Sequence, residues 1–309
     1  MGDRNQVIIR ASWVGIGGNA ALAVLKITVG IIAGSLAVIG DGIDSGADII
    51  ASVITLLTAR LMSRPPNVKF PYGYEKADAI ASKVLSFIIF FAGAQLAIAT
   101  TTALIQGTER EIPSMIAIWV TVFSILSKLL LALYLHKKGQ KVASPMLMAN
   151  AKNMQNDVII SGGVLTGLFF TFFLDMPLID SLTALLVSGW IMYSAVKIFM
   201  KTTPELLDGV QDASIYEDVF RTISSIKGVY NPHRARIRKV GNRYVIAIDI
   251  EVDGSKTVRE AHEMAREVEQ KIKNSIQNVY DILVHVEPYG NVEDDEKFGA
   301  SSKNIRSGK

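Results

Sequence analysis

The chain has 309 residues, of which 50 % are hydrophobic and 20 % are charged, and its mean hydropathy is positive. This composition is too apolar for a soluble domain of this size, and the apolar residues crowd between residues 7 and 200. A membrane part followed by a smaller water-exposed part is therefore expected. The net charge of only +3 argues against nucleic acid as a partner, and the absence of cysteine excludes disulfides and thiolate metal ligands.

Six apolar segments are each long enough to cross the ~30 Å hydrocarbon core of a bilayer, which takes about 20 helical residues. The first of them is too long to be the apolar core of a cleavable signal peptide. In chain order the predicted membrane helices are Val7–Ala33, Leu36–Met62, Ala77–Ile105, Pro113–Leu135, Met146–Phe173 and Leu178–Met200.

Basic residues gather in alternate connectors between these segments. The connectors without a basic excess are Ala33-Gly34-Ser35, the run around Glu109-Arg110-Glu111, and the one with Asp175 and Asp180. Because Lys and Arg favour the cytoplasmic side, we expect both termini in the cytoplasm and the protein in the plasma (inner) membrane. The basic residues are Arg4 and Arg10, then Arg60, Arg64, Lys69 and Lys76, then Lys137, Lys138 and Lys141, and finally Lys197 and Lys201.

The last third has the pattern of a small soluble α+β domain. Its order of helix, strand, strand, helix and strand is typical of a ferredoxin-like, metallochaperone-like fold, with a hairpin turn at Gly241-Asn242 and a capping box from Thr257 to Glu260. About 85 residues make a small core, which favours a homodimer. The predicted elements are Ser214–Ile226, His233–Lys239, Tyr244–Val252, Thr257–Ile276 and Ile282–Val286.

Three domains follow from these patterns. Residues 1–203 form a six-helix transmembrane domain, and residues 204–290 form a cytoplasmic α+β domain that is expected to dimerise; the resemblance described below implies that this domain also binds metal. The tail, 291–309, is acidic and then rich in Ser, Lys and Gly, so we expect it to be disordered.

The second span carries three acids in the stretch S-L-A-V-I-G-D-G-I-D-S-G-A-D. Asp41, Asp44 and Asp48 stand at i, i+3 and i+7 and share one helix face within a ~60° arc. Each acid costs ~2.5–3.5 kcal/mol at a bilayer centre, so such residues are functional by default. Asn153 and Asp157 form a second pair, at i and i+4, in the fifth span.

Two helices that offer pairs of oxygen ligands to each other form a four-ligand cation site. We predict that Asp44, Asp48, Asn153 and Asp157 form it, with Asp41 as a possible auxiliary ligand nearer the outer end of its span. The alternative is that some of these acids line a wet crevice or pair with Lys152 or Lys26.

These stretches, with P-Y-G-Y-E-K-A-D and N-M-Q-N-D, resemble the cation diffusion facilitators. The resemblance runs from the first span to about Gly290. It implies a dimeric antiporter of divalent metal and protons, with six membrane helices, a cytoplasmic metal-binding domain and the four-ligand site halfway across the membrane.

This chain departs from the family's zinc-selective pattern at Asn153. Such members usually have His-x-x-x-Asp in the fifth span, whereas this chain has Asn153-x-x-x-Asp157. Oxygen ligands suit a harder ion, so we expect Mn²⁺ to be favoured, then Fe²⁺, with Zn²⁺, Co²⁺ and Ni²⁺ open. No prosthetic group is expected. The family's accessory site after the second span corresponds here to Asn67, Phe70 and Tyr74, so that site is expected to be absent.

Three of the four histidines fall in the soluble domain, whereas His136 is interpreted as a residue of the membrane interface. A lone histidine is commonly a surface or capping residue. The resemblance, through N-P-H, A-I-D, E-A-H and V-H-V-E, implies instead a cytoplasmic metal site made of His233, Asp249, His262, His285 and Glu287. It also implies a charge pair between Lys76 and Asp208 near the dimer interface, the alternative being two unrelated surface charges.

The function predicted from the sequence is export of divalent transition-metal ions from the cytoplasm in exchange for protons. The protein is then a secondary transporter and not an enzyme, and its partners are the bilayer, a second copy of itself, metal ions and protons. One alternative is a membrane metal sensor or scaffold that does not transport. Another is an intramembrane aspartyl protease using Asp41 and Asp157, although residues 38–41 read V-I-G-D instead of G-x-G-D. No phosphate-binding loop supports an ATP-driven pump.

Overall fold

The computed structural model describes residues 2–106, 111–142, 144–210, 212–241, 243–291 and 297–301. Most of the predicted tail, the connector residues Glu109 and Arg110, and Asn242 of the predicted hairpin turn lie outside them. The chain divides into two compact units. The first comprises the residues up to Thr58 together with Ala81–Phe199, and the second comprises Ala59–Ile80 and the residues from Met200 onward.

Six long apolar helices are present, as predicted, and each is long and apolar enough to cross a membrane. The main differences from the predicted bounds are at α4, which begins after Pro113 and continues through the basic run that follows Leu135, and at α6, which continues through Pro204. The helices are α1 (Gly2–Ala33), α2 (Leu36–Met62), α3 (Ala77–Ile105), α4 (Ile116–Lys141), α5 (Pro145–Phe173) and α6 (Leu178–Leu206).

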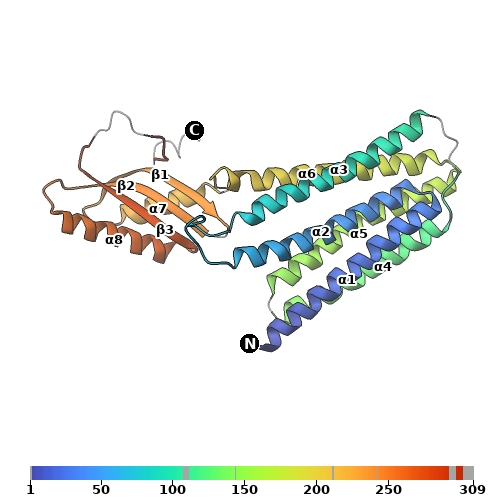
Figure 1. Ribbon diagram of the computed structural model, residues 1–309, viewed down its shortest axis with the longest axis horizontal. Coiled ribbons are helices and arrows are strands. Elements are labelled where there is room, and N and C mark those ends of the chain that lie inside the picture. The colour runs from blue at the N-terminus through green and yellow to red at the C-terminus, as the bar shows by residue number, and fades with distance from the viewer. Residues whose placement is uncertain are drawn as a thin grey trace. The chain divides into compact units, whose positions relative to one another are not determined.

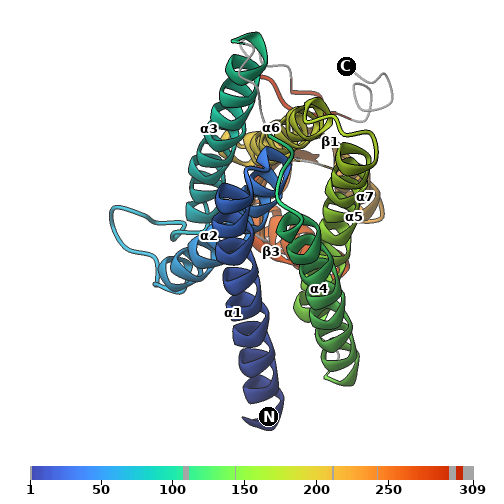
Figure 2. The ribbon, with the colours of Figure 1, turned by 90° about the vertical axis from the view of Figure 1, so that its right-hand side faces the viewer.

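Small residues allow these helices to approach closely. In the first unit α1, α4 and α5 pack together, and α2 lies between that group and the α3–α6 pair (Figures 1 and 2). On α2, Gly42 faces Ile27 of α1, and Gly40 faces Leu96 of α3 and Val187 of α6, with no room for a Cβ atom at either glycine. Because lipid tails provide no hydrophobic drive between helices, such close contacts hold the bundle together.

The soluble part folds as the predicted α+β domain. Its elements are α7 (Ser214–Ser224), β1 (Tyr230–Val240), β2 (Arg243–Val252), α8 (Val258–Ser275) and β3 (Val279–Pro288). The sheet has the order β1-β2-β3, with β1 antiparallel and β3 parallel to β2.

The two helices pack against one face of this sheet. On β2, Ile246, Ile248 and Ile250 alternate inward and are fully buried against residues of α7 and α8 such as Val219 and Val268. The predicted capping box at Thr257 and Glu260 is present and begins α8. Of the tail predicted to be disordered, the described residues 297–301 include a β-bridge from Ala300 to Ala235; the disorder of the rest stays a prediction.

Candidate metal sites

Two membrane helices carry the predicted ligands at matching depths. Asp48 lies 12 residues into α2 and Asp157 lies 12 residues into α5, so each side chain is ~18 Å along its helix, near the middle of a bilayer. Asp157 is buried, whereas Asn153, one turn earlier on α5, is exposed on this single chain. The two predicted ligands on α5 therefore differ in exposure: the Asp157 carboxylate is buried and the Asn153 side chain is accessible from outside this chain.

The structure brings α2 and α5 ligands together. The Nδ2 atom of Asn153 lies 3.3 Å from Oδ1 of Asp48. The side chain of Asp48 also lies beside that of Asp157, and Asp44 stands one turn before Asp48 on the same face of α2. The Oδ2 atom of Asp48 is buried, and no residue of the described chain donates a hydrogen bond to it. Carboxylates that face one another with an unsatisfied oxygen are the arrangement that a cation completes.

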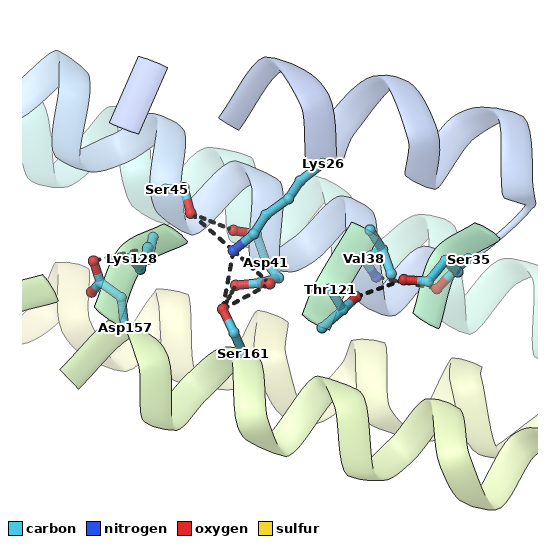
Figure 3. Close-up of polar contacts among 10 residues, drawn as sticks. Lys26, Ser35, Val38, Asp41, Ser45, Thr121, Lys128, Asp157 and Ser161 are labelled. Carbon is cyan, nitrogen blue, oxygen red and sulfur yellow. Dashed lines mark hydrogen bonds and ion pairs between the residues drawn. The ribbon is translucent and has the colours of Figure 1, made fainter. Parts of the chain in front are cut away.

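A lysine also enters this cluster, and it was missed in the sequence reasoning. Lys128 on α4 is fully buried, and its Nζ atom lies 3.0 Å from Oδ2 of Asp157 (Figure 3). The available signal was a single lysine inside the apolar run S-I-L-S-K-L-L-L, since an ionisable residue within a membrane span is functional by default.

Asp41 belongs to a separate cluster. Its Oδ2 atom lies 2.7 Å from Nζ of Lys26, and both of its carboxylate oxygens lie within 2.9 Å of Oγ of Ser161. Lys26 also donates to Ser161 over 3.0 Å and to Ser45 over 3.4 Å, so α1, α2 and α5 meet at one closed polar network (Figure 3). The pairing of Asp41 with Lys26 was one of the sequence alternatives, and an auxiliary metal role for Asp41 stays a prediction.

The sheet of the soluble domain aligns the second set of predicted ligands. Asp249 on β2 stands opposite His233 on β1 and beside His285 on β3. Asp249 and Glu287 are buried, although carboxylates rarely are. One ligand atom from each of His233, Asp249 and Glu287 lies within 4.8 Å of the others, which is close enough to hold one ion.

The orientation of His233 suits metal binding. Its Nδ1 atom lies 2.7 Å from the carbonyl oxygen of Asn231, which can only accept, so a neutral ring carries its proton on Nδ1. The Nε2 atom then faces Glu287, 3.6 Å from Oε2. His285 approaches the other oxygen of Glu287 to 3.4 Å, so one carboxylate links the two imidazoles.

Two features of this site differ from the sequence prediction. Burial raises the pKa of Asp249, while Arg234, whose Nη2 atom is 2.5 Å from Oδ2 of Asp249, opposes that rise. Arg234 reaches this position because β1 is bulged there and Arg234 itself has φ 46°. His262 is exposed on α8 and lies outside the three-residue group, so its role as a ligand stays a prediction.

The predicted charge pair is present in the second unit. Nζ of Lys76 lies 2.5 Å from Oδ1 of Asp208, and both side chains are partly exposed. A second pair joins the same loop to β2, where Arg243 lies 2.6 Å from Glu75. The Arg243–Glu75 contact holds the loop after α2 at the start of β2, the central strand of the sheet, whereas the expected proximity of Lys76 and Asp208 to a dimer interface stays a prediction.

Two family models match almost the whole chain. Residues 12–207 match the cation efflux transmembrane domain, and residues 211–289 match the cytoplasmic domain of cation efflux proteins. The uncharacterised transporter YdbO of Bacillus subtilis (strain 168) is 35 % identical over 269 residues, which is 86 % of this chain and 91 % of that protein. The manganese efflux system protein MneS of the same organism is 30 % identical over 277 residues, covering 89 % of this chain and 93 % of that protein.

Among solved structures, the metal-bound C-terminal domain of the CzcD transporter from Thermotoga maritima is 42 % identical. It covers 26 % of this chain and 93 % of that domain, with a TM-score of 0.25. The two family models carry the assignment, and because members are metal transporters and not enzymes, they exclude the protease alternative. The chain is therefore a multi-pass membrane metal-efflux transporter and belongs to the cation efflux, or cation diffusion facilitator, family.

Proposed function

We propose that this transporter exports Mn²⁺ from the cytoplasm in exchange for protons, and that Asp44, Asp48, Asn153 and Asp157 bind the ion in transit. The observation that carries the proposal is the contact between the Asn153 amide and Asp48 at 3.3 Å, which joins α2 and α5 through oxygen-bearing side chains. The chain's histidines are at positions 136, 233, 262 and 285, so α2 and α5 have no imidazole to contribute.

The chemistry of these ligands supports manganese. Carboxylate and amide oxygens suit harder ions such as Mn²⁺, whereas Zn²⁺ favours nitrogen and sulfur. Intrinsic affinity rises from Mn²⁺ through Fe²⁺ to later metals, so ligand type must be helped by geometry or metal availability if Mn²⁺ is to be preferred, with Fe²⁺ the nearest competitor and Zn²⁺ left open. The related MneS is a manganese efflux protein, which agrees with this preference.

Protons are the natural counter-substrate of a carboxylate site. Acid side chains must lose protons before they bind a metal ion, so metal binding releases protons and proton binding releases metal. A site near the middle of the membrane that opens to each side in turn then exchanges one for the other. A proton gradient directed into the cell drives the metal outward.

The proposed setting is a homodimer in the plasma membrane, with both termini in the cytoplasm. The alternation of basic connectors supports that orientation, and the match of residues 211–289 to the cytoplasmic domain of the family supports dimerisation. We propose that the cytoplasmic ligands, including His233, Asp249 and Glu287, bind metal as a regulatory site. Ion binding there would favour one dimer arrangement and so change the transport equilibrium.

Flux into proteoliposomes tests the ligand argument. Asn153→His restores an imidazole, so we expect the Zn²⁺-to-Mn²⁺ flux ratio under an imposed pH gradient to rise by about tenfold or more. Asn156→His is the matched control, since Asn156 stands on the same helix but lines a cavity between α5 and α6. We expect this control to leave the ratio unchanged.

Two results would contradict the proposal. An unchanged ratio in the Asn153→His variant would show that ligand softness does not set the preference. If metal flux does not depend on the imposed pH gradient, the protein does not exchange metal for protons. If folded, inserted protein transports no divalent metal, the sensor or scaffold alternative is favoured.

A further inference from the structure

The proposed transport site holds a positive charge, which a site built only to attract a metal ion would lack. Lys128 has no exposed surface, and its ammonium group lies 3.0 Å from Asp157. It comes from α4, which packs along α5 and therefore presents the lysine to a neighbouring helix (Figure 3). A buried charge of this kind requires compensation, because removing a partner from a buried ion pair is strongly destabilising.

The bonding of Lys128 differs from that of a structural lysine in the same domain. Lys26 has Asp41 as its ionic partner and two serine hydroxyls as further acceptors, so its three donors are satisfied in place. Among the described residues, Asp157 is the one hydrogen-bond acceptor of Lys128. The lysine at the transport site is thus held by a single proposed metal ligand.

The charges around Lys128 match a divalent ion. When ionised, Asp44, Asp48 and Asp157 together carry −3, and Lys128 reduces the local charge to −2. The Lys26–Asp41 pair is neutral as a unit and leaves this sum unchanged. One doubly charged ion would therefore neutralise the cluster. To bind Oδ2 of Asp157, the ion must first displace the ammonium group of Lys128 from that oxygen.

We propose that Lys128 is a tethered competitor of the transported ion. In the metal-free site its ammonium group occupies Asp157, and an incoming divalent ion displaces it. The flexible four-carbon side chain allows this movement without a shift of α4. After displacement the same charge remains near the ion and repels it, which keeps binding weak enough for release. Lys128 is thus a residue that sets affinity by competing with the ion, and this role rests on the transport site proposed above.

Binding of Mn²⁺ to the purified full-length dimer tests the proposal. Free Mn²⁺ is measured by electron paramagnetic resonance at about pH 8, where protons compete less with the metal ion for carboxylates than they do at neutral pH. All variants carry His233→Ala and His285→Ala, which weaken the cytoplasmic site. We expect Lys128→Met to lower the Kd for Mn²⁺ by about tenfold or more, because a nearby like charge has been removed. Flux at saturating Mn²⁺ should fall as release slows.

Two variants serve as controls. Lys128→Arg retains the charge, so its Kd should stay within a few-fold of the reference protein. Lys83→Met removes a lysine from another membrane helix, where the ammonium contacts the carbonyl oxygen of Phe199, and the Kd should not change. An unchanged or raised Kd in folded Lys128→Met protein would overturn the competitor role, because a purely structural lysine would loosen the site when lost.

Asp48→Asn separates failure of this inference from failure of the proposed function. If Asp48→Asn binds Mn²⁺ as tightly as the reference protein, the transport site itself is wrong. If Asp48→Asn loses binding while Lys128→Met binds normally, only the role of Lys128 is overturned. Should Lys128→Met not fold, a structure of the Mn²⁺-loaded wild type decides: we expect the Lys128 ammonium to have left Asp157, and a retained ion pair beside bound Mn²⁺ contradicts the proposal.

Discussion

Two lysine–aspartate pairs lie inside the same membrane domain, and they are built differently. Lys26 and Asp41 share Ser161, which reaches both carboxylate oxygens, so their polar atoms are engaged within one network. Lys128 and Asp157 form an equally buried pair, but Asp157 also borders Asp48, whose Oδ2 atom receives no hydrogen bond from the described residues.

The difference shows which buried charges are available for function. A pair whose donors and acceptors are all used can only hold helices together, because an added ion would find no ligand. A pair that adjoins surplus carboxylate oxygens has both spare ligands and spare negative charge. On this basis we infer that Lys26–Asp41 is a structural contact between α1 and α2, and we propose that Lys128–Asp157 lies on the path of the ion.

The largest loss of stability should come from breaking the ion pair between Lys26 and Asp41. Lys26→Met leaves the Asp41 carboxylate buried without its ionic partner, and we expect a loss of about 3–5 kcal/mol in the free energy of unfolding. Denaturant unfolding of the detergent-solubilised protein measures this change.

The double variant Lys26→Met/Asp41→Asn is the control for that experiment. It removes both charges and keeps an acceptor for Ser161, so much of the lost stability should return. If Lys26→Met is as stable as wild type, the pair is not the structural contact described here, and the contrast between the two pairs fails.

A substitution at Asp48, beside the Lys128–Asp157 pair, should reduce transport and leave the stability of the protein unchanged. Asp48→Asn retains shape but removes a ligand charge, so Mn²⁺ flux should fall by more than about 100-fold, since even residues outside the ligand set cost 10–100-fold in metal sites. Unfolding should be close to that of wild type, because no cation loses its partner.

Asp180→Asn is the matched substitution for this prediction. Asp180 is also a buried acid of a membrane helix, but it bonds to Ser35 and to the backbone N–H of Leu36 at the start of α2. Flux of this variant should stay near wild type. Equal losses of flux in the two variants would mean that any buried acid matters, and the assignment of Asp48 to the ion would be lost.

The smallest change in stability is expected for the partly exposed ion pair between Lys76 and Asp208. Lys76 and Asp208 are 34 % and 49 % exposed, so solvent screens their attraction, and a double-mutant cycle should give a coupling below ~1 kcal/mol. The cycle uses Lys76→Met and Asp208→Asn, with unfolding of the detergent-solubilised protein as the readout. A coupling above about 2 kcal/mol would show that the pair behaves as a buried one.

Much of the architecture could be predicted from the sequence because its signals are local. Runs of apolar residues determine the six helices, and the alternation of Ile246, Ile248 and Ile250 determines the buried face of β2. Spacing on one helix also placed Asp44 and Asp48 on a common face. The helix ends were less predictable, since the basic run after Leu135 continues α4 although it is not apolar.

Partners that depend on packing between distant helices could not be predicted in this way. Lys128 and Asp157 are 29 residues apart, and Lys26 and Ser161 are 135 apart, so no local pattern links them. Arg234 reaches Asp249 only because the strand is bulged at that point. The sequence therefore indicated the candidate acids, whereas the arrangement in space shows the bases that pair with them, which are Lys26, Lys128 and Arg234.

A structure of the protein loaded with Mn²⁺, with the metal located by its anomalous scattering, tests the central claim most directly. We predict one ion between α2 and α5, bound by oxygens of Asp44, Asp48, Asn153 and Asp157. An ion bound elsewhere in the membrane domain, or Asp44 and Asp48 turned away from Asp157 in the loaded protein, would contradict the account.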